Sequence, residues 1–285
     1  MSDFPRTKIE DLSVPRLIAG ANWFMGATHQ SVAKDQFIRH HMTRERIADV
    51  LEVFFNAGVN AVLGVGPGGA RLIEAIADAE DRTGREGIKI SAPALRVDRG
   101  AEADDENARV LDAYAAIGVR VCMPHQSATD AMINVPNRRI EGMEHLLAMI
   151  RERGMIPGLS THRPESVLYA DETGLDLRTY IQIYNAAGFL MQVEVDWAQR
   201  VIHGAAQPVL TIKPLAAGHL PPLVGLAFSW ATLRRQDMVA VGTMSPDEAR
   251  EVIDISLSIL DGRLPERELQ ITRSKYSLTG EAMPQ

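Results

Sequence analysis

The sequence is short of cysteine and of long apolar runs, and each shortage excludes a class of protein. A single cysteine, Cys122, can form no disulfide within the chain, which excludes a disulfide-stapled fold and favours a reduced, cytoplasmic location. No apolar run is long enough to span a bilayer, and the first residues lack the basic and apolar regions of a signal peptide. We therefore expect a soluble protein.

Positive charge is also in deficit. Lys and Arg number 30 against 37 Asp and Glu, so the formal net charge is −7 and a nucleic-acid-binding surface is not expected. With 46% hydrophobic and 24% charged residues over 285 positions, the composition is that of an ordinary globular protein. We expect a small-molecule substrate, neither nucleic acid nor membrane as partner, and leave a homo-oligomer open.

A repeated pattern of helix, glycine and short β-rich run passes along the chain. Thr43 is placed to cap a helix that ends at Gly58, and residues 59–63 follow as a strand. The pattern returns at Gly118 and at Gly154, where a left-handed glycine would let the chain turn sharply from helix into strand. Eight candidate strands begin near Leu17, Val59, Ile88, Val119, Met155, Tyr180, Val209 and Met238.

Strict alternation of strand and helix predicts parallel strands joined by helical crossovers. Eight such units favour a single α/β domain over residues 1–285, a (β/α)8 TIM barrel, with 1–14 as an N-terminal extension and 264–285 as a C-terminal tail. An open doubly wound sheet is the alternative. In a barrel, chemistry occurs at the C-terminal ends of the strands, so polar residues there become the candidates.

Histidines follow the fourth and fifth predicted strands, and a lysine follows the seventh. His125 and His162 are the predicted acid/base residues, because neutral imidazoles suit proton transfer and carbonyl polarisation near pH 7. Lys213 is the third predicted catalytic residue, as a base, an anion ligand or a Schiff-base nucleophile. A structural histidine and a paired lysine are the alternatives.

Other polar residues at strand ends are predicted to bind substrate. Most belong to the long segment after the first strand, whose alternative role is simply to fold over the barrel mouth. The predicted substrate-binding residues are Asn22, His29, Ser31, Lys34, Asp35, Arg96, Tyr184 and Asn185.

A metal site built from His29, His125 and His162, with Asp98 as a fourth ligand, is a further alternative. The sequence contains no His-x-His or Glu-x-x-His spacing to support it, so no metal ligands are predicted.

The second half of the chain resembles the aldo-keto reductase superfamily. Residues 208–220 are similar to that family's seventh strand and its Pro-Leu-Ala-x-Gly-x-Leu loop, and residues 241–251 to its eighth-strand cofactor segment. Residues 158–162 and 182–185 are similar to its fifth- and sixth-strand segments. The resemblance implies NADP as cofactor, bound by Ser160, Thr161, Gln182, Pro214, Leu215, Gly242, Thr243, Met244 and Arg250.

The chain departs from that family at three of its four catalytic positions. The family places an aspartate after strand two, a tyrosine shortly beyond and a lysine at the end of strand three, whereas this chain has Leu63-Gly64, no tyrosine before Tyr114, and Ser91-Ala92-Pro93. Only His125 matches the family's catalytic histidine.

The sequence therefore predicts an aldo-keto-reductase-like oxidoreductase with a non-standard catalytic set, acting on a small polar or carbonyl substrate. Two alternatives stay open. One is a lyase, isomerase or aldolase that uses Lys213 or a metal. The other is a non-catalytic, ligand-binding or regulatory barrel.

Overall fold

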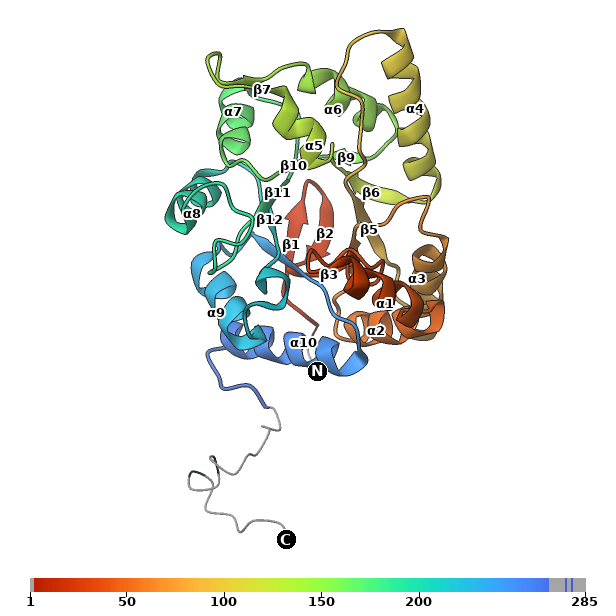
Figure 1. Cartoon of the computed structure of the whole chain (residues 1–285), viewed down its shortest axis with the longest axis vertical. Coiled ribbons are helices and arrows are strands. Elements are labelled where there is room, and N and C mark those ends of the chain that lie inside the picture. Colours follow the sequence, from red (N-terminus) through yellow and green to blue (C-terminus); the bar gives the residue numbers. More distant parts are fainter. Residues whose placement is uncertain (1–2, 267–274, 276–277, 279–285) are drawn as a thin grey trace.

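The computed structural model describes residues 3–266, 275 and 278, and its centre is a ring of parallel strands (Figure 1). The spatial order is β10-β11-β12-β13-β3-β4-β5-β6-β9. The strands are β3 (Leu17–Gly20), β4 (Ala61–Leu63), β5 (Ile88–Ser91), β6 (Val119–Cys122), β9 (Ile156–Pro157), β10 (Leu159–Thr161), β11 (Tyr180–Ile183), β12 (Val209–Ile212) and β13 (Met238–Val241).

Gly158 brings the two ends of this sheet together. It alone separates β9, which pairs with β6, from β10, which pairs with β11, so β9 and β10 form one interrupted strand. The Gly158 N–H donates to Cys122 O at 3.1 Å, and the Leu159 N–H donates to Thr179 O at 3.1 Å. A Cβ at position 158 would lie 2.6 Å from Thr179 O, so this crossing point accepts only glycine.

Helices follow the strands and surround the ring (Figure 1). They are α2 (Arg44–Asn56), α3 (Ala70–Thr83), α4 (Ala101–Ala116), α6 (Met143–Glu152), α7 (Glu165–Thr173), α8 (Val195–Gly204), α9 (Pro222–Thr232) and α10 (Pro246–Leu260). The predicted (β/α)8 barrel is confirmed, and the eight predicted strand starts lie within two residues of the observed ones.

Side chains cap the starts of α2 and α10, and the cap at Thr43 was predicted. The Thr43 side chain accepts the Arg46 N–H at the start of α2, and Gly58 holds a left-handed φ of 81° after it. At the start of α10, Ser245 accepts the Glu248 N–H at 3.1 Å while Glu248 accepts the Met244 N–H at 2.6 Å.

The N-terminal extension folds into the barrel. Strands β1 (Arg6–Ile9) and β2 (Leu12–Pro15) form an antiparallel hairpin directly before β3. Ile9 and Val14 are fully buried and pack with the barrel-interior side chains of Ile18, Val121 and Leu210. This hairpin fills the N-terminal end of the barrel, opposite the end where the strands finish. The predicted C-terminal tail, 264–285, lies almost wholly outside the described residues.

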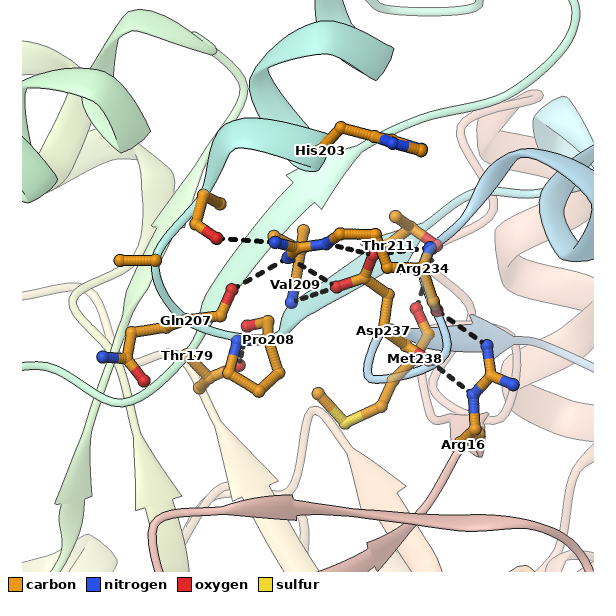
Figure 2. A network of polar contacts seen from close by, with 12 residues as sticks. Arg16, Thr179, His203, Gln207, Pro208, Val209, Thr211, Arg234, Asp237 and Met238 are labelled. Carbon is orange, nitrogen blue, oxygen red and sulfur yellow. Dashed lines mark hydrogen bonds and ion pairs between the residues drawn. The ribbon is translucent and has the colours of Figure 1, made fainter.

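A polar network ties β12 and β13 together at their N-terminal ends (Figure 2). Asp237, fully buried, accepts the Val209 N–H at 2.9 Å and pairs with the Arg234 guanidinium at 2.8 Å. Arg16 donates to Asp237 O at 3.0 Å and to Arg234 O at 2.9 Å, which extends the network to β3. Each buried charge therefore has a partner, as burial requires.

Several shorter elements complete the chain. They are α1 (Val32–His41), α5 (Gln126–Thr129), the 3-10 turns η1 (Asp130–Met132) and η2 (Ala216–Gly218), and the hairpin of β7 (Ile133–Asn134) and β8 (Arg139–Ile140). Helix α1 is not among the predicted elements, and His40 and His41 lie in its last turn. Its periodicity was a weak signal because Ile38 is its only fully buried residue. Within the described part of the chain, no helix is both long and apolar enough to cross a membrane.

Candidate functional site

A cavity of about 770 Å³ opens at the C-terminal ends of the barrel strands. This is the end at which barrels of this kind carry their sites. Its apolar lining includes Trp23, Ile181, Ile212 and Val252. Its polar lining consists of Asn22, Thr28, His29, His125, Gln126, Ser160, His162, Lys213, His219, Thr243, Glu248 and Glu251.

The three residues predicted as catalytic meet in this cavity. His125 follows β6, His162 follows β10 and Lys213 follows β12, and all three side chains line it together with His29. They are close enough for their charges to interact, because the charges of Lys213, His125 and His29 each lower the pKa of His162. Residues far apart in sequence thus form one basic cluster, although their catalytic roles stay predictions.

Lys213 is the central cation of the cluster. Burial lowers the pKa of its ammonium group, and its Nζ lies 3.0 Å from His29 Nε2. Among the described residues, no carboxylate forms a salt bridge with it. Its backbone φ is 61°, in the left-handed region that is costly for a non-glycine residue. A half-buried cation without a carboxylate partner is suited to hold an anion or an oxygen that gains negative charge.

The local backbone sets the tautomer of His125. Its Nδ1 accepts the Ser127 N–H at 3.3 Å and lies 2.9 Å from Ser127 Oγ. Burial lowers the His125 pKa, partly offset by the Asp130 carboxylate, so the ring is neutral near pH 7. With Nδ1 accepting, the proton of a neutral ring is on Nε2, which is then a hydrogen-bond donor.

His162 is held beside the same carboxylate. Burial, followed by the charges of Lys213, His125 and His29, lowers its pKa to about 4. The His162 backbone N–H donates to Asp130 Oδ2 at 3.3 Å, and Thr161 Oγ1 donates to Asp130 Oδ1 at 2.6 Å. Burial raises the Asp130 pKa against these hydrogen bonds. Asp130 therefore ties the backbone after β10 to the segment after β6.

The cavity extends from the cluster to the first turns of α10. This part is lined by Gly242 and Thr243 at the end of β13, and by Glu248 and Glu251 on α10. Thr243 is 3% exposed, and its Oγ1 is buried without a hydrogen-bond partner in the described structure. An unpartnered buried hydroxyl in a cavity wall fits a polar group of a ligand.

Several further sequence predictions fall on the cavity wall. Asn22 and His29 line it among the predicted substrate residues. Ser160, Pro214, Leu215, Gly242 and Thr243 line it among the predicted cofactor residues.

The predicted substrate residues at the start of α1 do not line the cavity. Ser31 caps α1 by accepting the Lys34 N–H at 3.2 Å. The Lys34 ammonium lies over the Phe37 ring, 5.4 Å from its centroid. Asp35 accepts the Thr28 N–H at 3.0 Å and the Thr28 hydroxyl at 2.6 Å. Ser31, Lys34 and Asp35 therefore make their contacts with nearby residues of the same segment.

Three more predicted substrate residues lie elsewhere. Arg96 pairs with Asp98 and with two glutamates on α4, so neither it nor the suggested fourth metal ligand reaches the cavity. Tyr184 packs against Phe228 of α9, on the outside of the barrel, and donates its hydroxyl to Thr232. Asn185 holds the loop after β11, through two hydrogen bonds to the backbone of Phe189.

Four predicted cofactor residues also lie off the cavity wall. The Thr161 hydroxyl donates a hydrogen bond to Asp130. Gln182 is buried in the barrel, and its Oε1 has no hydrogen-bond partner among the described residues. The Met244 N–H donates a hydrogen bond to the Glu248 carboxylate, and Arg250 pairs with Asp247 on the exposed face of α10.

No group of three or more His, Cys, Asp or Glu side chains is arranged to hold a metal ion within the described residues. The three-histidine metal alternative therefore has no support in the geometry. His29, His125 and His162 share a cavity, but with a lysine among them rather than a carboxylate.

Sequence reasoning missed Trp23, Asp130, His219, Glu248 and Glu251. Trp23 and His219 lay in segments already singled out, so their position alone could have suggested them. Glu248 accepts the Met244 N–H at the start of α10, yet it lines the cavity as well. Asp130 lies in the insertion after β6, where no strand-end rule applies.

Several solved structures share this architecture. A provisionally assigned aldo-keto reductase from Pseudomonas aeruginosa matches with a TM-score of 0.65 at 17% identity, over 90% of this chain and 97% of that one. An aldo/keto reductase from Brucella melitensis gives 0.56 at 16% identity, over 90% and 93%. Phospho-2-dehydro-3-deoxyheptonate aldolase from Thermotoga maritima gives 0.54 at 12% identity, over 91% and 74%. No protein-family model and no curated protein sequence matches the chain.

These likenesses show the fold alone. The chain has a (β/α)8 barrel like that of the aldo-keto reductases, at a distance where sequence identity carries little information. An aldolase shares the same architecture, so the fold does not choose between redox and lyase chemistry.

Proposed function

We propose that the protein is a carbonyl reductase for small polar substrates, in which a lysine and imidazoles replace the tyrosine of the aldo-keto reductases. The observation that carries the proposal is the cluster of Lys213, His125 and His162 in one cavity at the strand ends. Reduction of a carbonyl develops negative charge on its oxygen, and this cluster offers donors to that oxygen.

The chain's own residues account for binding and proton transfer. The Nε2–H of neutral His125 polarises the carbonyl oxygen, and the Lys213 ammonium donates the proton that converts the alkoxide into an alcohol. His29, exposed and 3.0 Å from Lys213 Nζ, returns a proton to Lys213 from solvent. A nicotinamide dinucleotide, which the family resemblance implies as NADP, would supply the hydride when bound.

The residues present fit a dinucleotide in part. The cavity of about 770 Å³ runs from the basic cluster to α10, and the unpartnered Thr243 hydroxyl lies in its wall. Ser160, Pro214, Leu215, Gly242 and Thr243 would hold the cofactor.

A paired set of variants tests the proposal. Purified protein is assayed for oxidation of NADH and NADPH with a panel of small aldehydes, ketones and 2-oxo acids, and Lys213→Met should lower turnover at least 100-fold. The control is Lys34→Met, which removes the same charge from α1, outside the cavity wall. Turnover that survives Lys213→Met contradicts the assignment of the proton donor. Dinucleotide binding without turnover of any carbonyl would instead favour the ligand-binding alternative.

A second function is favoured by one observation, the lowered pKa of Lys213. Burial increases the fraction of the neutral amine, which is the nucleophile of Schiff-base aldolases and lyases. The amine would add to a carbonyl and release water, forming an imine. Borohydride would reduce that imine to a stable secondary amine, seen by mass spectrometry as an adduct on Lys213 that Lys213→Met abolishes. No adduct across the carbonyl panel rejects this second function.

The proposal also covers location and partners. We expect a cytoplasmic protein whose partner is a small molecule rather than nucleic acid or a membrane, with self-association as a further expectation. The formal net charge of −7 supports the exclusion of nucleic acid.

A further inference from the structure

Among the four side chains of the basic cluster, the His162 ring is the one without a hydrogen bond to the described residues. His125 Nδ1 is engaged by the next residues of its own loop, and His29 Nε2 lies 3.0 Å from Lys213 Nζ. His162 donates to Asp130 from its backbone N–H, so both nitrogens of its half-buried ring remain available to a ligand. The ring lines the cavity, yet in the proposed reaction it neither contacts the carbonyl oxygen nor transfers a proton.

The strand register places His162 between His125 and Lys213 along the rim. The Ser160 N–H donates, at 3.3 Å, to the carbonyl of the residue that precedes His125, so the ends of β6 and β10 lie side by side. On the other side, β10, β11 and β12 run parallel, and their register sets His162 level with Ile212, the residue before Lys213. Neighbouring strands lie about 5 Å apart, so a ligand of a few carbon atoms can touch all three side chains.

The surroundings of the His162 ring favour an anion. Burial, and then the charges of Lys213, His125 and His29, lower its pKa to about 4, so the ring is neutral near pH 7 and within reach of the lysine charge. The Asp130 carboxylate accepts hydrogen bonds from the His162 backbone and from a threonine hydroxyl, and it does not line the cavity. An anion in the cavity would therefore gain from the Lys213 charge and from a hydrogen bond to the His162 ring.

The glutamates of the cavity wall follow a strand on the other side of the ring. Glu248 and Glu251 lie on α10, directly after β13. With β9 and β10 counted as one interrupted strand, β13 lies four strands from β6 by either route and three strands from β10. An anion at His162 therefore binds across the barrel mouth from the strand end that leads into α10.

We propose that the cavity is specific for 2-oxo acids, and that His162 binds their carboxylate while His125 and Lys213 contact the adjacent carbonyl oxygen. The inference rests on the proposed function, whose small polar substrates it narrows to one class. Reduction adds a hydride, from the reduced nicotinamide dinucleotide of that function, to the carbonyl carbon and the Lys213 proton to the oxygen. The products are a 2-hydroxy acid and the oxidised dinucleotide.

Binding of a 2-oxo acid analogue that resists reduction tests the inference. Oxamate, whose carbonyl belongs to an amide, is titrated by calorimetry into the full-length protein, alone and with NADH or NADPH present. It should bind, and His162→Leu should weaken its binding by about tenfold or more, whereas His162→Gln, which keeps one donor, should weaken it less. His145→Leu is the matched control, because this histidine pairs with Asp104 outside the cavity wall. Melting temperatures confirm that each variant is folded.

Turnover separates the inference from the proposed function. Wild type should reduce a 2-oxo acid with a kcat/KM at least about tenfold above that of its uncharged methyl ester, and His162→Leu should shrink this ratio. Equal values for acid and ester, or oxamate binding that is absent or unchanged in His162→Leu, overturn the inference while carbonyl reduction stands. Oxamate binding that His162→Leu weakens, with no carbonyl compound reduced, supports carboxylate recognition and overturns the proposed function. Neither binding nor turnover overturns both.

Discussion

Lys213 Nζ lies 3.0 Å from His29 Nε2, and both residues hold left-handed backbone, with φ of 61° and 60°. Non-glycine residues rarely adopt this conformation, which costs about 1 kcal/mol or more per residue. A second contact, from Gln30 Nε2 to Ala217 O at 2.6 Å, joins the same two loops. The loop after β3 and the loop after β12 thus hold the ammonium–imidazole pair between them.

Removing Lys213 should lower turnover more than removing His29. Lys213→Met removes the proton donor and should lower kcat at least 100-fold. His29→Gln removes only the link to solvent and should lower kcat about tenfold, with partial rescue by added imidazole. Steady-state kinetics in buffers of increasing imidazole concentration measure both. Equal losses in the two variants, with no rescue, would contradict a relay.

Activity should fall at alkaline pH because the donor must be protonated. Burial lowers the Lys213 pKa from its usual 10.5. Activity should therefore fall as the pH rises through this lowered pKa, and the fall should begin below pH 10.5. A pH profile of kcat for wild type and for Lys213→Arg checks this, since arginine stays charged and should remove the alkaline limb from whatever activity remains. A profile flat to pH 11 in wild type would contradict the assignment.

Gly242→Ala should disturb ligand binding with little change in the fold. A Cβ at this position would lie 2.5 Å from Trp23 Cδ1, and both residues line the cavity, so the indole must move. We expect about tenfold weaker dinucleotide binding and an altered tryptophan emission spectrum. Gly204→Ala, where a Cβ meets no atom within 4 Å, is the control. Unchanged binding in Gly242→Ala would show that Trp23 does not shape the ligand site.

Acid should destabilise the protein partly through His162. Its pKa is lowered to about 4 in the folded chain from an ordinary 6.5, so between these values the unfolded chain binds more protons and stability falls as pH falls. His162→Gln should flatten this decrease. Melting temperatures at about pH 7 and about pH 5 measure the difference, and an equal decrease in both proteins would place the acid sensitivity elsewhere.

Asp237→Ala should be strongly destabilising. The substitution leaves the buried Val209 N–H and the Arg234 guanidinium without their acceptor, which typically costs about 3–5 kcal/mol (Figure 2). Chemical denaturation measures the loss, with Asp247→Ala on exposed α10 as the control. A loss below about 1 kcal/mol would mean that water replaces the carboxylate.

Much of the fold could be predicted because it follows from local chemistry. Thr43 and Ser245 cap their helices through their own side chains, and Gly58 and Gly118 take left-handed φ between helix and strand. Eight repeats of this pattern admit few arrangements other than a barrel. The strand-end rule then placed His125, His162 and Lys213 at one rim.

The strand-end rule was less reliable for residues whose side chains form hydrogen bonds with the nearby backbone. Ser31 and Asn185 lie in the expected segments, but each makes local hydrogen bonds instead of facing the cavity. Tyr184 lies one residue beyond β11, and strand alternation directs it outward under α9. Only coordinates reveal which of these competing contacts a polar side chain makes.

The sequence by itself determined the order of strands and helices and the end of the barrel at which chemistry is expected, because caps, glycines and apolar periodicity act over a few neighbouring residues. Tertiary structure decided which side chains meet. The pairing of Lys213 with His29 and the hydrogen bond from the His162 backbone N–H to Asp130 both join segments distant in sequence. Such contacts depend on barrel closure at Gly158 and on loop conformation, which no local pattern encodes.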